Sequence, residues 1–318
     1  MQKNRNCFSL VAVCLLVCLC LSGCGVQQQT AQQAADSYTF TDAFGQQITV
    51  QNPQRVVALM GSFAEIWCLA GGADTLVGVT SDAFDGRDLG LSADIAVVGT
   101  FQNPNMEEIL ALEPDLVLLS AETKGTDSHV ALKDAFTSAG ITAAYFSVTH
   151  FDDYLAMLKI CTEITGDTAA YQANGQAVQE TIAQLIADNR LETAPSALLL
   201  ITYSGGVRPQ SSDSMTGKML ADLGCHNLAD DYPSLLKDFS VEKVIEADPD
   251  YIFVIAMGND DDVAVKNLQQ TVEGNPAWSS LTAVQQHRYF LLPKEKFLYK
   301  PNARWADSYA YLADLLHA

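Results

Sequence analysis

Three arginines are the side chains of this chain best suited to bind an anionic small molecule. Arg87, Arg208 and Arg304 fall in loops after predicted strands, and parallel sheets bind ligands at the carboxyl ends of their strands. A guanidinium group pairs in bidentate fashion with carboxylate or catecholate oxygens. These arginines predict a site for an anionic chelate, while an ordinary surface role remains the alternative for each of them.

Aromatic and other polar side chains occur in the same predicted loops. Aromatic rings there are suited to stack on a flat or bulky chelate. The residues predicted to bind ligand are Ser62, Phe63, Arg87, Phe101, Gln102, Tyr203, Arg208, Met257, Tyr299 and Arg304.

An internal repeat places two glutamates at equivalent positions. Residues 106–119 (MEEILALEPDLVLL) align without a gap with residues 241–254 (VEKVIEADPDYIFV), which pairs Glu107 with Glu242. Each copy predicts a short amphipathic helix, an acidic-Pro-Asp stop and a buried parallel strand. The repeat therefore predicts two similar α/β lobes around a shared cleft, where small ligands usually bind.

Glu107 and Glu242 also have a local interpretation. Each lies in the first turn of its predicted helix, after Asn105 or Ser240 as the N-cap. A carboxylate at this position stabilises the helix by about 0.3 to 1 kcal/mol. An exposed carboxylate can do this and still pair with an arginine of a partner protein.

The N-terminus predicts export and lipidation. Lys3 and Arg5 precede an apolar run over residues 8–21, which ends in the string LSGC at Cys24. This pattern predicts a signal peptide over residues 1–23, and the run is shorter than the ~18 to 20 residues that span a bilayer. Residues 24–37 are poor in apolar side chains and predict a flexible tether.

Composition excludes some functions. The net charge of the 318-residue chain is −20 and becomes −22 without Lys3 and Arg5, which argues against nucleic acid as a partner. Cys68, Cys161 and Cys225 remain in the folded part, in apolar surroundings typical of small buried side chains rather than a disulfide framework.

Alternating strands and helices predict a parallel sheet in each lobe. The predicted N-terminal lobe spans residues 38–166 and begins with a β-hairpin at 38–50. Residues 167–191 predict one interlobe helix, roughly 35 Å long at ~1.5 Å per residue, and residues 192–318 form the C-terminal lobe. Strands are predicted at 55–59, 76–80, 95–98, 142–148 and 197–203, Ser62 is the predicted N-cap of a helix ending near Leu69, and residues 304–316 form the closing helix.

Several motifs resemble one family along almost the whole chain. RVVALMGSFAEI from residue 55, VGTFQNPNMEEILALEPDLVLL from residue 98, LGCHNLADD from residue 223 and ARWADSYAYLADLL from residue 303 are similar to the substrate-binding lipoproteins of iron-chelate and cobalamin ABC importers. The resemblance implies a class III periplasmic-binding-protein-like fold: two Rossmann-like lobes, a single long connecting α-helix and a ligand cleft that closes only modestly.

The resemblance also implies specific roles. Cys24 would carry lipid and anchor a monomer to the extracytoplasmic face of the cell membrane. Glu107 and Glu242 would enter arginine pockets on an ABC permease dimer, which works with its ATPase. The cargo would be an iron chelate, that is, a ferric siderophore or haem, or alternatively a corrinoid, with no resident cofactor. Met257 would be an axial ligand in the haem case, whereas Gln102 replaces a methionine found in some haem-binding relatives.

Two other classes of protein fit the sequence less well. A free-metal carrier needs convergent histidines and carboxylates, and His129, His150, His226, His287 and His317 are scattered, with Cys225-His226 lacking a second close pair. A secreted hydrolase needs an activated nucleophile, and Gly61-Ser62 lacks the second glycine of the nucleophile elbow. The sequence therefore predicts a binding protein with no catalytic residues and no protein metal site.

Overall fold

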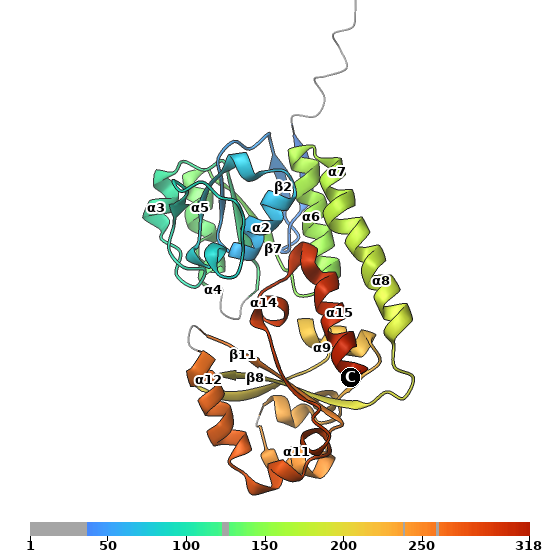
Figure 1. Cartoon of the computed structure of the whole chain (residues 1–318). Helices are drawn as coiled ribbons and strands as arrows, with labels where there is room; N and C mark the ends of the chain where they lie inside the picture. Colours follow the sequence, from blue (N-terminus) through green and yellow to red (C-terminus); the bar gives the residue numbers. More distant parts are fainter. Residues whose placement is uncertain (1–36, 123–126, 238, 259–260) are drawn as a thin grey trace, which may run out of the picture.

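The computed structural model describes residues 37–122, 127–237, 239–258 and 261–318 (Figure 1). The predicted signal peptide, Cys24 and the tether up to residue 36 lie outside these residues. No helix within the described residues is long and apolar enough to cross a membrane.

The N-terminal lobe is built on a parallel sheet with the strand order β5-β4-β3-β6-β7. Side chains of successive residues in β3 and β6 enter two different core clusters, so both faces of the sheet are covered. This explains why the strands are continuous apolar runs. The strands are β3 Val56–Ala58, β4 Leu76–Val79, β5 Ala96–Val97, β6 Leu116–Ser120 and β7 Thr142–Phe146, and the helices on their faces are α2 Gly61–Leu69, α3 Met106–Ala111, α5 Lys133–Ala139 and α6 Phe151–Thr165.

A β-hairpin begins this lobe, as predicted. Strands β1 (Tyr38–Thr41) and β2 (Gln47–Val50) pair antiparallel. Phe40 of β1 packs on Phe146 of β7 with ring centroids 5.8 Å apart, which joins the hairpin to the core.

The predicted N-cap at Ser62 is wrong. Helix α2 has Met60 as its N-cap residue, and the Gly61 N–H donates to Asp82 Oδ2 at 2.7 Å. A carboxylate 21 residues further along the chain thus takes the capping role, because the loop after β4 folds back on the start of α2. Ser62 lies inside the helix and is buried.

The C-terminal lobe repeats the architecture with one addition. Its parallel strands follow the order β10-β8-β11-β12, and β9 pairs antiparallel with β8. The bounds are β8 Ser196–Tyr203, β9 Gly206–Gln210, β10 His226–Asn227, β11 Tyr251–Ala256 and β12 Tyr289–Leu292, with α9 Met215–Asp222 and α15 Trp305–Leu316 on one face and α11 Val241–Ala247 on the other.

The two copies of the repeat have the same local structure, which confirms the duplication. Glu113 and Asp248, the acidic residues before each proline, both have a positive φ, of 46° and 43°. Asp115 accepts the backbone N–H groups of Gln54 and Arg55 at the start of β3. Asp250 likewise accepts the backbone N–H and hydroxyl of Ser196 at the start of β8.

The segment that joins the lobes is helical from Thr168 to Asn189 but is not uniform. It consists of α7 (Thr168–Tyr171), a π-helical turn η3 (Gln172–Gln176) and α8 (Ala177–Asn189). Asp167 caps it by accepting from the Ala170 N–H at 3.0 Å, as expected. Figure 1 shows α8 running from beside α6 down to the C-terminal lobe, with α15 alongside it.

Short elements complete the described chain. They are η1 Ala73–Thr75, η2 Ser81–Phe84, α4 Asp127–Ala131, α10 Leu228–Asp231, η4 Pro233–Leu236, α12 Asp261–Leu268, η5 Gln269–Glu273, η6 Pro276–Ser280, α13 Thr282–Gln285, α14 Lys294–Phe297 and η7 Asn302–Arg304.

Candidate functional site

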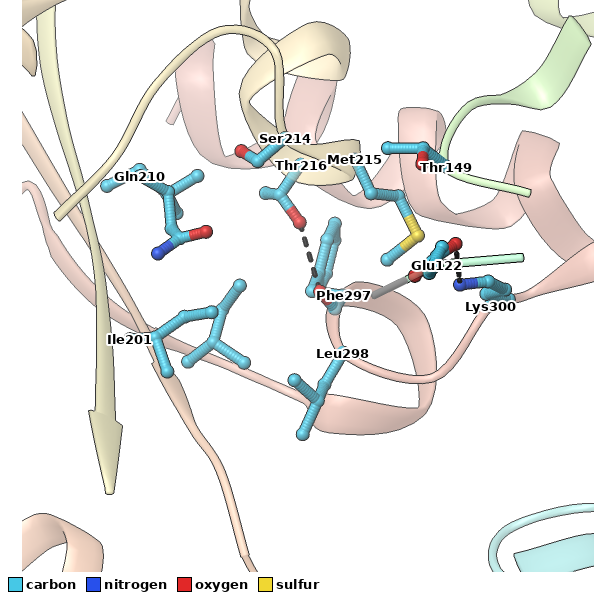
Figure 2. A pocket seen from close by; sticks show the side chains of 12 residues that line it. Glu122, Thr149, Ile201, Gln210, Ser214, Met215, Thr216, Phe297, Leu298 and Lys300 are labelled. Carbon is cyan, nitrogen blue, oxygen red and sulfur yellow. Dashed lines mark hydrogen bonds and ion pairs between the residues drawn. The ribbon is translucent and has the colours of Figure 1, made fainter. Parts of the chain in front are cut away.

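A cavity of about 160 Å³ lies where the two lobes meet (Figure 2). The N-terminal lobe contributes Glu122 and Thr149, which follow β6 and β7. The C-terminal lobe contributes one face of its sheet, the start of α9 and the end of α14 with the loop after it. The lining residues are Glu122, Thr149, Leu199, Ile201, Gln210, Ser214, Met215, Thr216, Ile255, Phe297, Leu298 and Lys300.

One face of the C-terminal sheet forms the floor of this cavity. In the antiparallel register Leu199 lies opposite Gln210, and in the parallel register Ile255 lies beside Ile201. Residues directly paired between neighbouring strands point to the same face, and side chains alternate along each strand. The face of the sheet that lines the cavity is therefore defined by these four residues.

Three of the predicted ligand contacts share that face. Arg208 pairs with Ile201, and its side chain is exposed. Tyr203 lies two residues beyond Ile201 on β8. Met257 continues the β11 ladder, because its N–H donates to the Thr202 carbonyl at 2.8 Å. An arginine, a tyrosine and a methionine thus extend from the cavity lining at the carboxyl ends of β8 and β11.

An ion pair crosses the cleft beside the cavity. Lys300 Nζ lies 3.3 Å from Glu122 Oε1 and joins the C-terminal segment to the end of β6 (Figure 2). The Thr216 hydroxyl donates to the Phe297 carbonyl at 3.1 Å and fixes the start of α9 against the loop after α14. Side-chain contacts therefore join the two lobes at the cavity and fix the start of α9 within the C-terminal lobe.

Three further predicted contacts gather around a buried carboxylate instead. Glu65 of α2 is 3% exposed and accepts from Arg87 Nε at 3.1 Å and from Arg304 Nη1 at 2.7 Å. The Arg87 guanidinium also lies over the Tyr299 ring, 5.6 Å from its centroid. The structure thus brings Arg87, Tyr299 and Arg304 together, but none of them lines the cavity.

The other predicted contacts belong to the N-terminal lobe. Phe63 is fully buried and packs edge-on against Phe146, so it is a core residue in this structure, and Ser62 is buried next to it. Phe101 is half-buried and Gln102 is exposed, in the loop between β5 and α3. The structure does not bring these four residues to the cavity.

His129 fixes the loop that carries Phe101. Its Nδ1 lies 3.1 Å from the Ser120 N–H and must accept, so Nε2 carries the proton and donates to the Phe101 carbonyl at 2.7 Å. Burial lowers the pKa of His129, outweighing the opposing effects of the Phe101 carbonyl and Asp82. The neutral imidazole is therefore a structural link rather than a metal ligand.

The two predicted docking glutamates are exposed in matching first turns. Asn105 Oδ1 accepts from the N–H groups of Glu107 and Glu108, and Ser240 Oγ accepts from the Lys243 N–H, which confirms both predicted caps. The Ser240 hydroxyl in turn donates to Glu242 Oε2 at 3.0 Å. Backbone N–H and Ser240 hydrogen bonds lower the pKa of Glu242, so this carboxylate is charged at neutral pH.

The thiols of the described residues are free and inert. Burial raises the pKa of Cys161 and of Cys225 to about 12, and burial together with the charge of Glu65 raises that of Cys68 to about 11. The thiolate is the reactive form, so these cysteines act as small core side chains. Among the described residues, no group of three or more His, Cys, Asp or Glu side chains could hold a metal ion.

Sequence reasoning missed Glu65, Asn302, Glu122 and Lys300. A signal for Glu65 was present: it is the lone charge in the otherwise apolar string GSFAEIWCLA, and a buried charge requires a partner. The partners lie more than 230 residues away, at Asn302 and Arg304, and no local pattern points to them.

Two α/β lobes, a helical connection and a cavity between the lobes define a bilobal ligand-binding protein. A profile of the periplasmic binding protein family matches residues 56–296, so the chain belongs to this family. It is a binding protein and not an enzyme.

Known proteins resemble this chain along most of its length. The Fe(3+)-citrate-binding protein YfmC of Bacillus subtilis (strain 168) is 25% identical over 299 residues, covering 90% of this chain and 89% of YfmC. The uncharacterized ABC transporter substrate-binding lipoprotein YvrC of the same organism is 25% identical over 295 residues, covering 88% and 87%. The structure of S. aureus IsdE complexed with heme superposes with a TM-score of 0.68 at 16% identity, covering 83% of this chain and 99% of IsdE. The predicted class III fold is confirmed.

Proposed function

We propose that this chain captures an iron chelate outside the cytoplasm and delivers it to the permease of an ABC importer. The observation that carries the proposal is the placement of Arg208, exposed on the sheet face that lines the interlobe cavity, in a member of the periplasmic binding protein family. The similarity to the Fe(3+)-citrate-binding protein YfmC supports iron as the metal of the cargo.

The chemistry of this face favours a chelate with anionic oxygen donors. The Arg208 guanidinium pairs with carboxylate oxygens, and the Tyr203 ring can stack on a chelate or donate a hydrogen bond. Gln210 and Ser214 add neutral polar groups to the lining. Typical ligand pockets hold ~300 to 1,000 Å³. Since the cavity measures about 160 Å³, an iron chelate requires the lobes to separate or lining side chains such as Met215 to rotate.

Anchoring and partners complete the proposal. Cys24 carries lipid after removal of residues 1–23, and the tether up to residue 37 holds the lobes at the extracytoplasmic face of the membrane. Glu107 and Glu242 dock on the two permease subunits of the importer, which its ATPase drives. The lipoprotein description of YvrC and the exposure of both glutamates support these roles.

Calorimetric titration with a panel of ligands tests the proposed cargo. The panel contains ferric citrate, a ferric catecholate siderophore, haemin and cyanocobalamin, each beside its metal-free form where one exists. We expect saturable binding of a ferric chelate, and weaker binding of the iron-free ligand. Binding of ferric ion alone at equal affinity, or of no member of the panel, would contradict the proposal.

Met257 makes haem the second candidate for the bound ligand. Its side chain extends on the lining face beside Tyr203, and a thioether is a known haem iron ligand. Haemin bound through Met257 would shift its absorption bands, and Met257→Leu would abolish that shift. An unchanged spectrum in Met257→Leu would remove haem ligation by this residue.

A further inference from the structure

The segment from Tyr299 to Trp305 belongs to the predicted C-terminal lobe, yet its side chains bind the N-terminal lobe. We call it the crossing segment. Tyr299 contacts Arg87, and Lys300 pairs with Glu122. Trp305 is 1% exposed and packs on Phe151 and Tyr154 of α6, with ring centroids 5.8 Å and 6.1 Å away.

Glu65 is the centre of these contacts. One oxygen, Oε2, accepts from Arg87 Nε and from Asn302 Nδ2, the latter at 2.8 Å. The other oxygen, Oε1, accepts from Arg304 Nη1. The Asn302 amide also donates to the Ser62 carbonyl at 3.0 Å. A single carboxylate of α2 thus receives donors from its own lobe and from the crossing segment.

The burial of this cluster makes its pairing important. The side chains of Glu65 and Arg87 are each 5% exposed, and Asn302 is fully buried. A buried charge without its partner is strongly unfavourable, so loss of the carboxylate would leave Arg87 uncompensated. Arg304 is different, since 49% of its side chain is exposed and it can return to water.

The cluster also contains polar atoms that are not satisfied in this arrangement. Within the described residues, Ser62 Oγ and Asn302 Oδ1 are buried without a hydrogen-bond partner. Asn302 further adopts a positive φ of 52°, in the left-handed region that asparagine tolerates better than most residues with a side chain. The bonds that Asn302 donates to Glu65 and to the Ser62 carbonyl offset the cost of its unpaired oxygen, so this carboxylate contributes to the conformation of the crossing segment.

We propose that Glu65 is an interlobe latch, a positioning residue that holds the crossing segment on the N-terminal lobe through Asn302 and Arg304. The latch stays closed while the cleft opens, so the lobes pivot about this contact and keep a fixed spacing. The inference goes beyond the proposed cargo, because it concerns the protein with or without ligand.

Hydrogen exchange on the full-length protein in detergent, without ligand, tests the latch. Glu65→Gln keeps the size of the side chain and removes its charge. We expect amide exchange at residues 61–65 and 299–305 to rise at least tenfold, while β6 and β11 keep their protection. A second readout is the dissociation rate of ferric dicitrate, which we expect to rise in the same variant because the lobes lose their fixed spacing.

A double-mutant comparison separates a latch from general destabilisation. Arg304→Gln should raise exchange in the same two regions, and the Glu65→Gln, Arg304→Gln double variant should be no worse than Glu65→Gln alone. Ile252→Val, in the core cluster of the C-terminal lobe that lies away from the latch, serves as a matched loss of stability. Lys237→Gln, an exposed charge change, serves as the second control.

Several outcomes would overturn the latch. They are unchanged exchange at 299–305 in Glu65→Gln, the same local rise in Ile252→Val, or additive effects of Glu65→Gln and Arg304→Gln. If Glu65→Gln does not fold, Arg304→Gln and Tyr299→Leu decide the question, because these side chains are only partly buried. If the parent binds no member of the ligand panel, the proposed cargo is wrong, and the exchange experiment still tests the latch.

Discussion

Arg87 and Arg208 look alike in the sequence, as arginines in loops after predicted strands, but their surroundings differ. Arg208 is exposed on the sheet face that lines the cavity. Arg87 is 5% exposed and paired with Glu65. The sequence could not separate these roles, because the partner of Arg87 lies 22 residues away on another element.

Replacing Arg208 tests the proposed site at the scale of one residue. Hydrogen bonds to charged groups contribute about 1.5 to 3 kcal/mol, so Arg208→Ala should weaken binding of ferric citrate about tenfold to hundredfold. Titration calorimetry measures the loss, and Lys237→Ala is the control for net charge. Equal affinities for Arg208→Ala and the parent would remove Arg208 from the site.

His129 should make stability depend on pH. Its pKa is lowered from 6.5 in the folded protein, so the unfolded chain binds a proton first as the pH falls. The stabilisation is therefore complete above about pH 6.5 and is lost progressively below it. Urea unfolding across this range should show a smaller decline for His129→Gln than for the parent, whereas the exposed His317→Gln should follow the parent. An identical decline in His129→Gln would contradict this assignment.

At the scale of elements, the predicted parallel strands of the N-terminal lobe and β8 match the structure within about two residues at each end, because continuous apolar runs are read easily. The sequence of β9 instead predicts a loop. It contains Arg208 and Pro209, and an edge strand tolerates both, so its sequence carries little apolar signal. The interlobe helix was predicted as uniform, but its π-turn depends on contacts with α6 and α2. Asn174 there accepts from the Tyr154 hydroxyl through its carbonyl and donates to the Leu69 carbonyl.

Gly175 tests the packing of this π-turn. A Cβ added at Gly175 would lie 2.8 Å from Leu155 Cδ1 and 3.2 Å from Leu158 Cδ2 of α6. Alanine normally stabilises a helix relative to glycine, yet overpacking typically costs about 1 to 3 kcal/mol. We expect Gly175→Ala to lower the free energy of unfolding in urea, and the exposed Gln176→Ala to leave it nearly unchanged. If Gly175→Ala is more stable than the parent, the prediction is wrong, and the side chains of α6 can move to make room for the methyl group.

At the scale of the whole molecule, the internal repeat predicted the duplicated lobes, and the matched backbone at Glu113 and Asp248 bears this out. The crossing segment could not be predicted in the same way. Its contacts with Glu65 join residues 237 to 239 positions apart, and they exist only once both lobes have folded. The sequence therefore predicted a cleft between two lobes and three residues on the sheet face that lines the cavity, namely Tyr203, Arg208 and Met257. It assigned Tyr299 and Arg304 to the ligand, whereas the structure pairs them with Arg87 and Glu65 of the N-terminal lobe.

The proposed attachment of the whole protein to the membrane depends on the sulfur atom of Cys24. If the Cys24 thiol accepts the lipid, Cys24→Ser should release or mislocalise the protein, because this thiol is the only acyl acceptor in the LSGC string and the apolar run over residues 8–21 is too short to span a bilayer. Cell fractionation and palmitate labelling measure this, and ligand affinity of the released protein should equal that of the parent. Cys68→Ser is the control. Retention and labelling of Cys24→Ser would place the lipid elsewhere.

Docking on the permease would use one glutamate from each lobe. A docking contact affects transport but not ligand binding, so the test compares uptake of the chelate with ligand affinity. Charge reversal at Glu107 or Glu242 replaces an attraction to a permease arginine with a repulsion of several kcal/mol. Glu107→Lys and Glu242→Lys should each reduce uptake of the ferric chelate by cells at least tenfold. Their ligand affinities should stay at the parent value, because both side chains are exposed and neither lines the cavity.

The neighbouring residues supply matched controls for this last prediction. Glu108→Lys and Lys243→Glu change the local charge in the same first turns without touching the proposed contacts. Both should transport normally if position rather than net charge matters. Normal uptake by the Glu107→Lys, Glu242→Lys double variant would leave the two carboxylates with only their local role, which is to stabilise the helix starts that Asn105 and Ser240 already cap. A fall in uptake matched by a fall in affinity would mean that the two helices shape the cleft, since a docking contact acts on transport alone.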